Sequence, residues 1–377
     1  MKKNMTLVSA VVAAITGLAV ALPGAVDYTQ VSYEVVLSQA TVDGLSLSGF
    51  SLYGVAVDGT GNVLYVDAQQ GATPFADALI KVNLANNSAS LIDSNLDTDP
   101  AVAPLPTLMN INSRRIAFEH DRLLFTNQGT AGATDTQIVQ VNTTSGAVSE
   151  IVASQANFTP VIGMQYHSTF AGSEIYTVVE GAFSGGTGEL WAVAINSTAT
   201  GWVAGTIEGI TVSNPRGLAN DSLGNIYIAS QGAAANDGVV TKVSGFNNFS
   251  SSGAVAADVT PSAFVGVDFN TISGFGIANG DWIFLKRGNS SPAIHIWNGT
   301  TLTTLPQSSI AAGLVNAGYA GSTFGDIPDF NGFAIRALSS TRTQVFVGAR
   351  DQTAVGGWAV LKITFGNSTA VEDWSSY

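Results

Sequence analysis

One strand pattern occurs six times along the chain, and this repeat constrains the fold more than any other feature. Each copy begins with a short apolar strand, turns at polar or glycine residues, and continues into a second apolar strand and further strands. The copies begin near residues 52, 115, 163, 216, 274 and 332. Four antiparallel strands per copy match the construction of a propeller blade. The sequence therefore predicts an all-β protein, a six-bladed β-propeller with four antiparallel strands per blade.

The repeats also predict the domain organisation. They fill residues 22–377 and leave no block for a second domain, so we expect a single propeller domain there. The segment from Val31 to Leu37 is a further strand, which we expect to pair beside the last blade where the ring closes. A β-sandwich or jelly roll is the alternative fold, but neither requires six copies of one strand order.

Residues 1–21 are typical of a secretory signal peptide. Lys2 and Lys3 precede an apolar run that ends in the small-residue pattern Ala19-Val20-Ala21. A membrane anchor is the alternative, but the run is shorter than the roughly 20 residues that a spanning helix needs. We therefore expect cleavage near Ala21, an extracellular protein and no membrane span.

Glycosylation motifs support this prediction. The pattern Asn-x-Ser/Thr, with x not proline, is the acceptor for N-linked glycans. It occurs at nine positions after the signal segment: Asn86, Asn142, Asn157, Asn196, Asn220, Asn248, Asn289, Asn298 and Asn367. The sequence thus indicates a secreted glycoprotein.

Charge and cysteine content exclude several classes of function. The chain has 27 Asp and Glu against 14 Lys and Arg, a formal net charge of −13, and no cysteine. An acidic surface disfavours nucleic acid and anionic lipid as partners. The lack of cysteine excludes disulfides, thiolate metal sites and cysteine catalysis. We expect a monomer with a small-molecule ligand as its partner.

Two segments carry a resemblance to known propellers. Residues 54–67 read Gly-Val-Ala-Val-Asp-Gly-Thr-Gly-Asn-Val-Leu-Tyr-Val-Asp, and the segment from Gly217 to Ser230 matches them. Both resemble six-bladed propellers of the NHL and gluconolactonase (senescence marker protein) type. The signal region, the sequons and the missing cysteines are similar to secreted fungal propellers, a group that includes the major-allergen propeller of skin yeasts and the trichothecene-cluster propeller protein.

The gluconolactonase resemblance implies a divalent metal held by a Glu, two Asn and an Asp on the inner strands. This chain departs from that pattern, because it reads Pro215-Arg216-Gly217-Leu218 and then Ala229-Ser230-Gln231. Arginine replaces the asparagine, serine replaces the aspartate, and no Glu-Gly-Pro occurs. A cation would be repelled by Arg216, and serine is a weaker ligand than a carboxylate. We therefore expect no cofactor, with Ca²⁺ as the alternative.

The predicted ligand site is the rim of the central pore, where loops from every blade converge. Half of the 12 Lys and Arg residues that remain after removal of Lys2 and Lys3 map to this rim: Arg114, Arg115, Arg216, Lys286, Arg287 and Arg350. Such a cluster predicts an anionic or carbonyl-bearing ligand. The alternative is a structural network in which these charges neutralise Asp67, Glu180 and Asp351. The residues predicted to contact the ligand are Arg114, Arg216, Arg287 and Arg350, with Tyr53 and Gln231 as orienting groups.

Other chemistry-bearing residues fit structural roles. No catalytic residue can be assigned, since Gly-x-Ser-x-Gly does not occur. His120, His167 and His295 lack metal-ligand spacing, so we expect them to make structural hydrogen bonds. Four tryptophans in predicted strands are expected to pack between blades: Trp191, Trp282, Trp297 and Trp358.

Three functional hypotheses remain open. The first is a secreted ligand-binding or accessory propeller without turnover, linked to fungal secondary metabolism or host interaction. The second is an enzyme of secondary metabolism that holds and folds a polyketide or terpenoid in the pore for cyclisation. The third is a metal-dependent lactonase or hydrolase.

Overall fold

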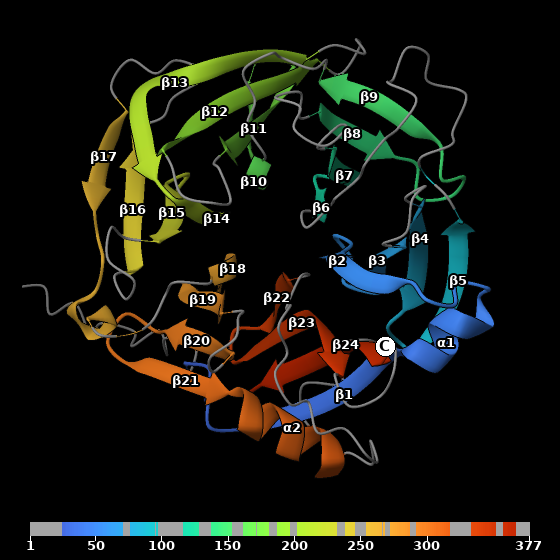
Figure 1. The fold of residues 1–377 in the computed structure, drawn as a ribbon. Helices are drawn as coiled ribbons and strands as arrows, with labels where there is room; N and C mark the ends of the chain where they lie inside the picture. The colour runs from blue at the N-terminus through green and yellow to red at the C-terminus, as the bar shows by residue number, and fades with distance from the viewer. Residues whose placement is uncertain are drawn as a thin grey trace, which may run out of the picture.

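Six four-stranded antiparallel sheets surround a central axis in the computed structural model of the chain, as Figure 1 shows. The prediction of a six-bladed β-propeller is confirmed. The structure describes residues 25–70, 76–94, 96, 116–127, 137–152, 161–170, 172–180, 187–196, 202–231, 238–245, 254–265, 267, 272–286, 292–316, 333–351 and 357–366. The predicted signal peptide, residues 1–21, lies outside these residues.

The strands of each blade are named A to D from the axis outward. Blade 1 holds β2 (Ser51–Val57), β3 (Val63–Gln70), β4 (Ala76–Asn83) and β5 (Ser88–Asp93). Blade 2 holds β6 (Ile116–Glu119), β7 (Arg122–Asn127), β8 (Gln137–Val141) and β9 (Val148–Val152). Blade 3 holds β10 (Val161–Phe170), β11 (Ser173–Glu180), β12 (Thr187–Asn196) and β13 (Trp202–Ser213). Blade 4 holds β14 (Pro215–Asn220), β15 (Ile226–Gln231), β16 (Gly238–Ser244) and β17 (Val255–Asp258). Blade 5 holds β18 (Ile272–Ala278), β19 (Asp281–Lys286), β20 (Ala293–Trp297) and β21 (Leu302–Pro306).

Blade 6 closes the ring with strands from both ends of the described chain. It consists of β22 (Phe333–Ser339), β23 (Arg342–Asp351), β24 (Gly357–Phe365) and, as its outermost strand, β1 (Val31–Ser38). Val31 pairs with Phe365 and Ser38 with Ala359 in antiparallel register. The predicted strand from Val31 to Leu37 therefore lies where the sequence analysis expects it.

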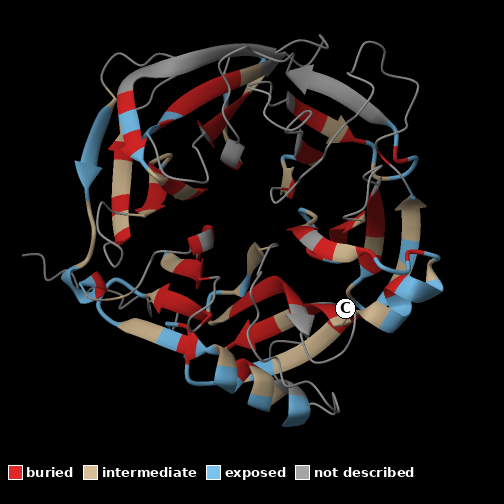
Figure 2. Ribbon diagram, viewed as in Figure 1, coloured by how far each residue is buried: buried red, intermediate tan, exposed pale blue. Residues whose placement is uncertain are grey.

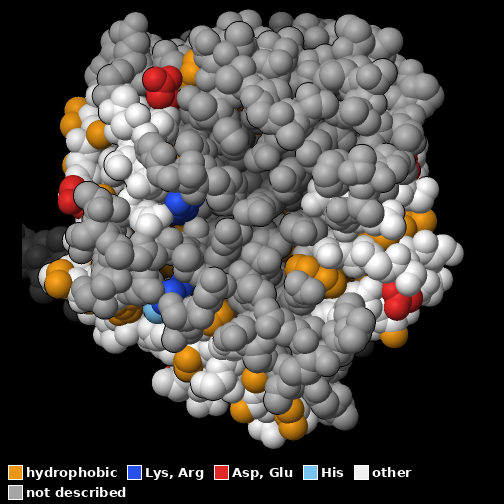
Figure 3. All heavy atoms as spheres, viewed as in Figure 1, with side chains coloured by type: hydrophobic (Ala, Val, Ile, Leu, Met, Phe, Trp, Pro, Cys, Tyr) orange, Lys and Arg blue, Asp and Glu red, His pale blue; other side chains and the backbone are white. Residues whose placement is uncertain are grey.

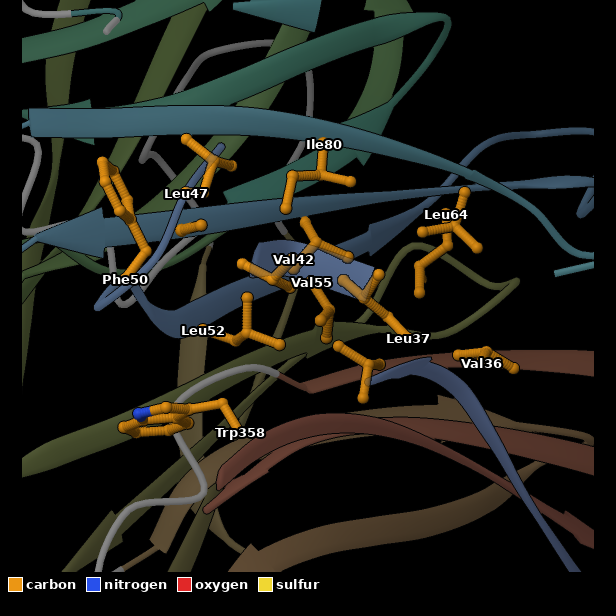
Figure 4. Close-up of a cluster of buried hydrophobic side chains, with 14 of the residues drawn as sticks. Val36, Leu37, Val42, Leu47, Phe50, Leu52, Val55, Leu64, Ile80 and Trp358 are labelled. Carbon is orange, nitrogen blue, oxygen red and sulfur yellow. The ribbon is translucent and has the colours of Figure 1, made fainter. Parts of the chain in front are cut away.

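Apolar side chains fill the layers between neighbouring blades, because each strand turns every second residue towards the next sheet. Figure 2 shows buried residues concentrated on middle strands of the blades, such as β3 and β24, and few on the outermost strands β5 and β17. In the cluster of Figure 4, Val42 of helix α1 (Gln39–Gly44) packs with Leu37 and Trp358 where blade 6 meets blade 1. Helix α2 (Gln307–Asn316) covers the outer edge with Ile310, and the 3-10 turn η2 (Ser262–Phe264) buries Phe264.

The predicted packing role of the tryptophans is confirmed. Trp191 and Trp358 are buried in clusters between blades, and Trp282 and Trp297 pack against a third cluster.

The Asp-x-x-Gly-Asn repeat forms one kind of turn between strands A and B. In blade 1, the Asp58 carboxylate accepts the backbone N–H of Asn62 at 2.9 Å, and Gly61 has a φ of +71°. In blade 4, Asp221 accepts the N–H of Asn225 at 2.9 Å, and Gly224 has a φ of +77°. Glycine adopts this left-handed conformation without a steric penalty, which explains why the same letters recur in both blades.

Glycines also allow the inner strands to approach one another. A Cβ atom on Gly217 of β14 would lie 2.6 Å from the Cβ of Phe275 on β18. The same crowding occurs between Gly163 and Leu218, and between Gly274 and Phe333. Each glycine is therefore covered by an apolar side chain of the next blade, which makes a closed wall around the axis.

No helix in the described part of the chain is long and apolar enough to cross a membrane.

Candidate functional site

The candidate site is the central channel, whose wall comes from the innermost strands of all six blades. It holds about 160 Å³ of space open to water-sized molecules. Figure 3 shows one face of the molecule hollowed at its centre, with Lys or Arg side chains beside the hollow. The described wall of the channel is mostly apolar, with Glu119 and Gln165 as the polar side chains in that part. Its largest apolar residues are Ile116, Phe118, Met164, Leu218, Phe275 and Phe333.

Glu119 ends β6 and faces an environment poor in polar partners. Its Oε2 accepts the backbone N–H of Tyr166 at 3.3 Å, a long hydrogen bond. No ion pair to Glu119 forms among the described residues. Burial in an apolar environment disfavours the carboxylate and raises the pKa of Glu119 to about 7, although the Tyr166 hydrogen bond opposes the shift. Near neutral pH this side chain therefore exists in both protonation states.

A second carboxylate lies on the solvent side of the same junction between blades 2 and 3. Glu174 on β11 accepts hydrogen bonds from Arg122 Nε at 2.8 Å and from the Tyr176 hydroxyl at 3.0 Å, and pairs with His120 Nδ1 at 2.9 Å. Burial alone would raise the pKa of Glu174, but these partners outweigh burial and lower it. The Tyr176 hydroxyl also lies 3.4 Å from the backbone oxygen of Glu119.

The junction between blades 3 and 4 is held by neutral groups instead. The Gln165 side-chain oxygen accepts the backbone N–H of Asn220 at 2.6 Å. The Asn220 amide donates to the backbone oxygen of Tyr166 at 3.0 Å and to the hydroxyl of buried Thr177 at 3.3 Å. Gln165 is therefore fixed in the channel wall by the neighbouring blade.

The structure brings two of the predicted rim residues together. Arg216 Nη2 on β14 donates to the side-chain oxygen of Gln231 on β15 at 2.9 Å, beside a register shift between Pro215 and Gly217. Tyr53 lies on β2 and Arg350 on β23, but their side chains are outside the described part. Arg114, Arg115 and Arg287 also lie outside the described residues. Ligand contact by the six predicted residues stays a prediction.

Of the groups in the alternative charge network, Asp67 and Lys286 are buried in blades 1 and 5. The side chains of Glu180 and Asp351 are outside the described part.

All three histidines make hydrogen bonds, as the sequence analysis predicts. His120 pairs with Glu174, and His167 bonds to the backbone oxygen of Gly224 at 3.0 Å. His295 is buried and bonds to the Thr304 hydroxyl at 2.9 Å. Within the described residues, no group of three or more His, Asp or Glu side chains could hold a metal ion.

The sequons fall at different kinds of position. Asn86, Asn142 and Asn298 are exposed and occupy the turn between strands C and D of blades 1, 2 and 5. Each uses its side-chain oxygen to accept backbone N–H groups of that turn, as in Ser88 N to Asn86 at 3.0 Å. Asn196 ends strand C of blade 3, and its side chain is outside the described part, as are Asn157, Asn248, Asn289 and Asn367. Asn220 differs, because its amide is engaged between blades.

Sequence reasoning missed Glu119. The signal that could reveal it is the alignment of the two-residue turns between strands A and B in blades 2 and 5, in which Glu119 pairs with Arg122 and Ala278 takes the corresponding place opposite Asp281. A glutamate where the matching blade has a small apolar residue is conspicuous at a channel wall.

No protein-family model matches the sequence. No curated protein gives a significant match to it either.

Solved structures share its fold. A protein of unknown function from Dyadobacter fermentans is similar with a TM-score of 0.51 and 8% identity, over 89% of this chain and 100% of that one. The GH93 alpha-L-arabinofuranosidase of Fusarium graminearum has a TM-score of 0.44 and 8% identity, over 84% and 94% of the two chains. TolB from Acinetobacter baumannii has a TM-score of 0.43 and 13% identity, over 68% of this chain. This chain spans only 54% of the length of TolB. At such identities the likeness concerns the fold alone, and the NHL and gluconolactonase type stays a prediction.

Proposed function

We propose that this chain is an exported β-propeller that binds a small molecule in its central channel. The observation that carries the proposal is the channel itself, which all six inner strands build and whose described lining is apolar except at Glu119 and Gln165. Ligand pockets typically combine apolar walls with a few placed polar groups. An accessory role in fungal secondary metabolism or host interaction, which the fungal resemblance implies, belongs to the same proposal.

Rigidity of the wall supports binding over a structural role alone. Gln165 is held by Asn220, and the inner strands are in close contact at Gly163, Gly217 and Gly274. A preformed site loses little conformational entropy when a ligand enters. Arg216 and Gln231, joined by their hydrogen bond, are candidates to contact the ligand at the rim.

The proposal includes export and glycosylation. The exposed sequons at Asn86, Asn142 and Asn298 share one kind of turn, on the edge of the ring away from the channel. Glycans there would leave the channel open. Mass analysis of the secreted protein before and after enzymatic deglycosylation, with sequencing of its N-terminus, tests this part of the proposal; an N-terminus still starting at Met1 would contradict it.

The binding function is tested by identifying what the channel carries. The wild-type protein is incubated with extract of the producing culture, repurified and denatured, and the released small molecules are identified by mass spectrometry. Ala117→Leu, which adds a larger side chain to the wall, serves as the blocked variant. We expect a molecule that is released by the wild type and absent from Ala117→Leu. Identical sets from both proteins would refute channel binding.

A second candidate is the cyclising enzyme, which the state of Glu119 favours. A general acid or base works best when its pKa is near the working pH, and the pKa of Glu119 is raised to about 7. Turnover would be supported if the wild type releases a chemically altered form of the molecule and a variant without the Glu119 carboxyl group does not. Recovery of the same molecule unaltered favours binding alone.

A further inference from the structure

We propose that the central channel selects a small molecule that joins an apolar body to a protonated amine, with Glu119 as the anchor of the ammonium group. This inference deepens the proposed function, since it names the chemical class of the channel ligand.

The first argument is the composition of the wall. Apolar side chains of five other inner strands surround the axis, among them Val57, Leu218, Phe275 and Ile335. They offer an apolar ligand a large contact area but give no preference for any polar group. Among the described residues that line the channel, Glu119 is the ionisable one, so it governs which polar group this part of the wall accepts.

The second argument is the incomplete set of partners around Glu119. Its carboxylate has one hydrogen bond, from Tyr166 N at 3.3 Å. A carboxylate has room for about four hydrogen bonds, and a charge that is partly withdrawn from water is unfavourable without a counterion. An ammonium group carries three N–H donors and a positive charge, and would satisfy both needs.

The third argument is that nearby charges are committed elsewhere. The described titratable groups around Glu119 are Glu174 and Tyr176 from β11, Tyr166 from β10, His120 from the turn after β6, and Arg122 from the start of β7. Arg122 donates to Glu174 at 2.8 Å and to Gln140 at 2.7 Å. Tyr176 donates to Glu174, and His120 pairs with the same carboxylate. Arg122 therefore bonds to Glu174 and not to Glu119, which leaves the Glu119 carboxyl group without an ion-pair partner among the described residues.

The aromatic rings of the channel and the net charge of the chain also favour a cationic ligand. Phe118, Phe275 and Phe333 line the channel, and an aromatic face attracts a cation. The formal net charge of −13 also raises the local concentration of cationic molecules.

The experiment uses three probes of similar shape: benzylamine, benzyl alcohol and toluene. Binding to the full chain is measured by calorimetry at pH 8 for the wild type, Glu119→Gln and Glu174→Gln. We expect the wild type to bind benzylamine at least tenfold more tightly than benzyl alcohol. The preference should disappear in Glu119→Gln and persist in Glu174→Gln, which alters the carboxylate on the other side of the junction.

A readout without any substitution keeps the inference falsifiable if a variant fails to fold. Because the ammonium needs the ionised form of Glu119, the wild type should bind benzylamine about tenfold more weakly at pH 6 than at pH 8. At pH 6, calorimetry in two buffers of different ionisation enthalpy should show close to one proton released per amine bound.

Three results would overturn the inference: no binding of benzylamine, equal binding of benzylamine and benzyl alcohol, or unchanged amine binding in Glu119→Gln. Each leaves the broader binding function to its own test, because a neutral molecule released by the wild type and absent from Ala117→Leu would still show a channel ligand.

Discussion

The channel side and the solvent side of the junction between blades 2 and 3 hold one glutamate each, and the two behave oppositely. On the solvent side, Glu174 is surrounded by Arg122, His120 and Tyr176, which lower its pKa. On the channel side, Glu119 has a single long hydrogen bond, and burial raises its pKa to about 7. Tyr176 touches both, through its hydroxyl.

The difference shows that polar side chains between blades and polar side chains on the channel wall can have different roles in a propeller. Polar groups between blades, such as Glu174, have their partners in the folded chain and stabilise it. Glu119 on the wall of the channel has one long hydrogen bond and no ion pair among the described residues, so the fold loses stability when its carboxyl group ionises. Perturbed pKa values of this kind are concentrated at functional sites, which makes Glu119 the more informative residue.

The largest expected effect is on the pH dependence of the unfolding free energy, which should differ in sign between Glu119 and Glu174. The folded protein binds a proton at Glu119 more tightly than the unfolded chain does, since the pKa rises from 4.5 to about 7. The contribution of protonated Glu119 to the unfolding free energy is therefore complete below pH 4.5, and it is lost as the pH rises through 7. Relative to Glu119→Gln, the wild type should lose up to about 3 kcal/mol of unfolding free energy between pH 4.5 and pH 8. Urea denaturation at both pH values measures this difference.

Equal pH profiles for the wild type and Glu119→Gln would contradict the assigned environment of Glu119. The variant is expected to be the more stable protein at pH 8, because an amide in this place carries no buried charge.

A smaller effect of opposite sign is expected at Glu174. Its lowered pKa contributes stability that is present above pH 4.5 and is lost as the pH falls further. Glu174→Gln removes the charge that Arg122 and His120 contact and should reduce the unfolding free energy by about 2 kcal/mol at pH 7. The reduction should shrink near pH 3 and in 1 M salt.

Glu189→Gln is the matched control, since Glu189 is an exposed glutamate on β12 of the same blade. Chemical denaturation should place this control within about 0.5 kcal/mol of the wild type. A loss as large as that of Glu174→Gln would mean that general surface charge, and not the junction, is responsible.

The contrast between these residues also shows what the sequence could and could not predict. The ring of six blades follows from local patterns: short apolar strands in a repeated order, joined by polar or glycine turns such as those at Asp58 and Asp221. The closing strand at Val31 is predictable for the same reason. Such signals are read within one repeat, and strand period and turn chemistry carry them.

The site depends on contacts between repeats, which no local pattern encodes. Glu119 and Glu174 are both glutamates in short strands, and only their neighbours in blade 3 make one a buried acid and the other an ion-pair partner. Arg216 and Gln231 are predicted to lie at one rim of the pore, and the structure shows a hydrogen bond between them across adjacent strands. Whether Arg216 and Gln231 contact a ligand is a question for binding experiments.

The neutral junction between blades 3 and 4 provides a reference that should not respond to pH. Asn220→Ala removes the amide that bonds to Tyr166 and Thr177, and should lower the unfolding free energy by about 1.5 kcal/mol. The loss should be the same at pH 4.5 and pH 8, because no group in this network titrates in that range. Equilibrium denaturation at the two pH values checks it.

Ser222→Ala is the control for glycosylation at this position. It destroys the Asn220 sequon but changes only an exposed hydroxyl, so stability should stay at the wild-type value. Because the Asn220 amide is engaged, we expect no glycan there, and peptide mass spectrometry of the secreted protein should find Asn220 unmodified. A glycan on Asn220 would contradict the network.

The smallest effect concerns His120, the outermost partner of Glu174. His120 has a φ of +49°, its side chain is 45% exposed, and its ring stacks on Tyr166 at 4.3 Å. An exposed pair contributes little, and asparagine tolerates the left-handed backbone better than alanine does. His120→Asn should therefore stay within about 0.5 kcal/mol of the wild type, while His120→Ala should lose about 1 kcal/mol. Equal destabilisation of the two variants in thermal denaturation would mean that the side-chain contacts of His120 matter more for stability than its left-handed backbone. The contacts of His120 with Glu174 and Tyr166 would then contribute more than its exposure indicates.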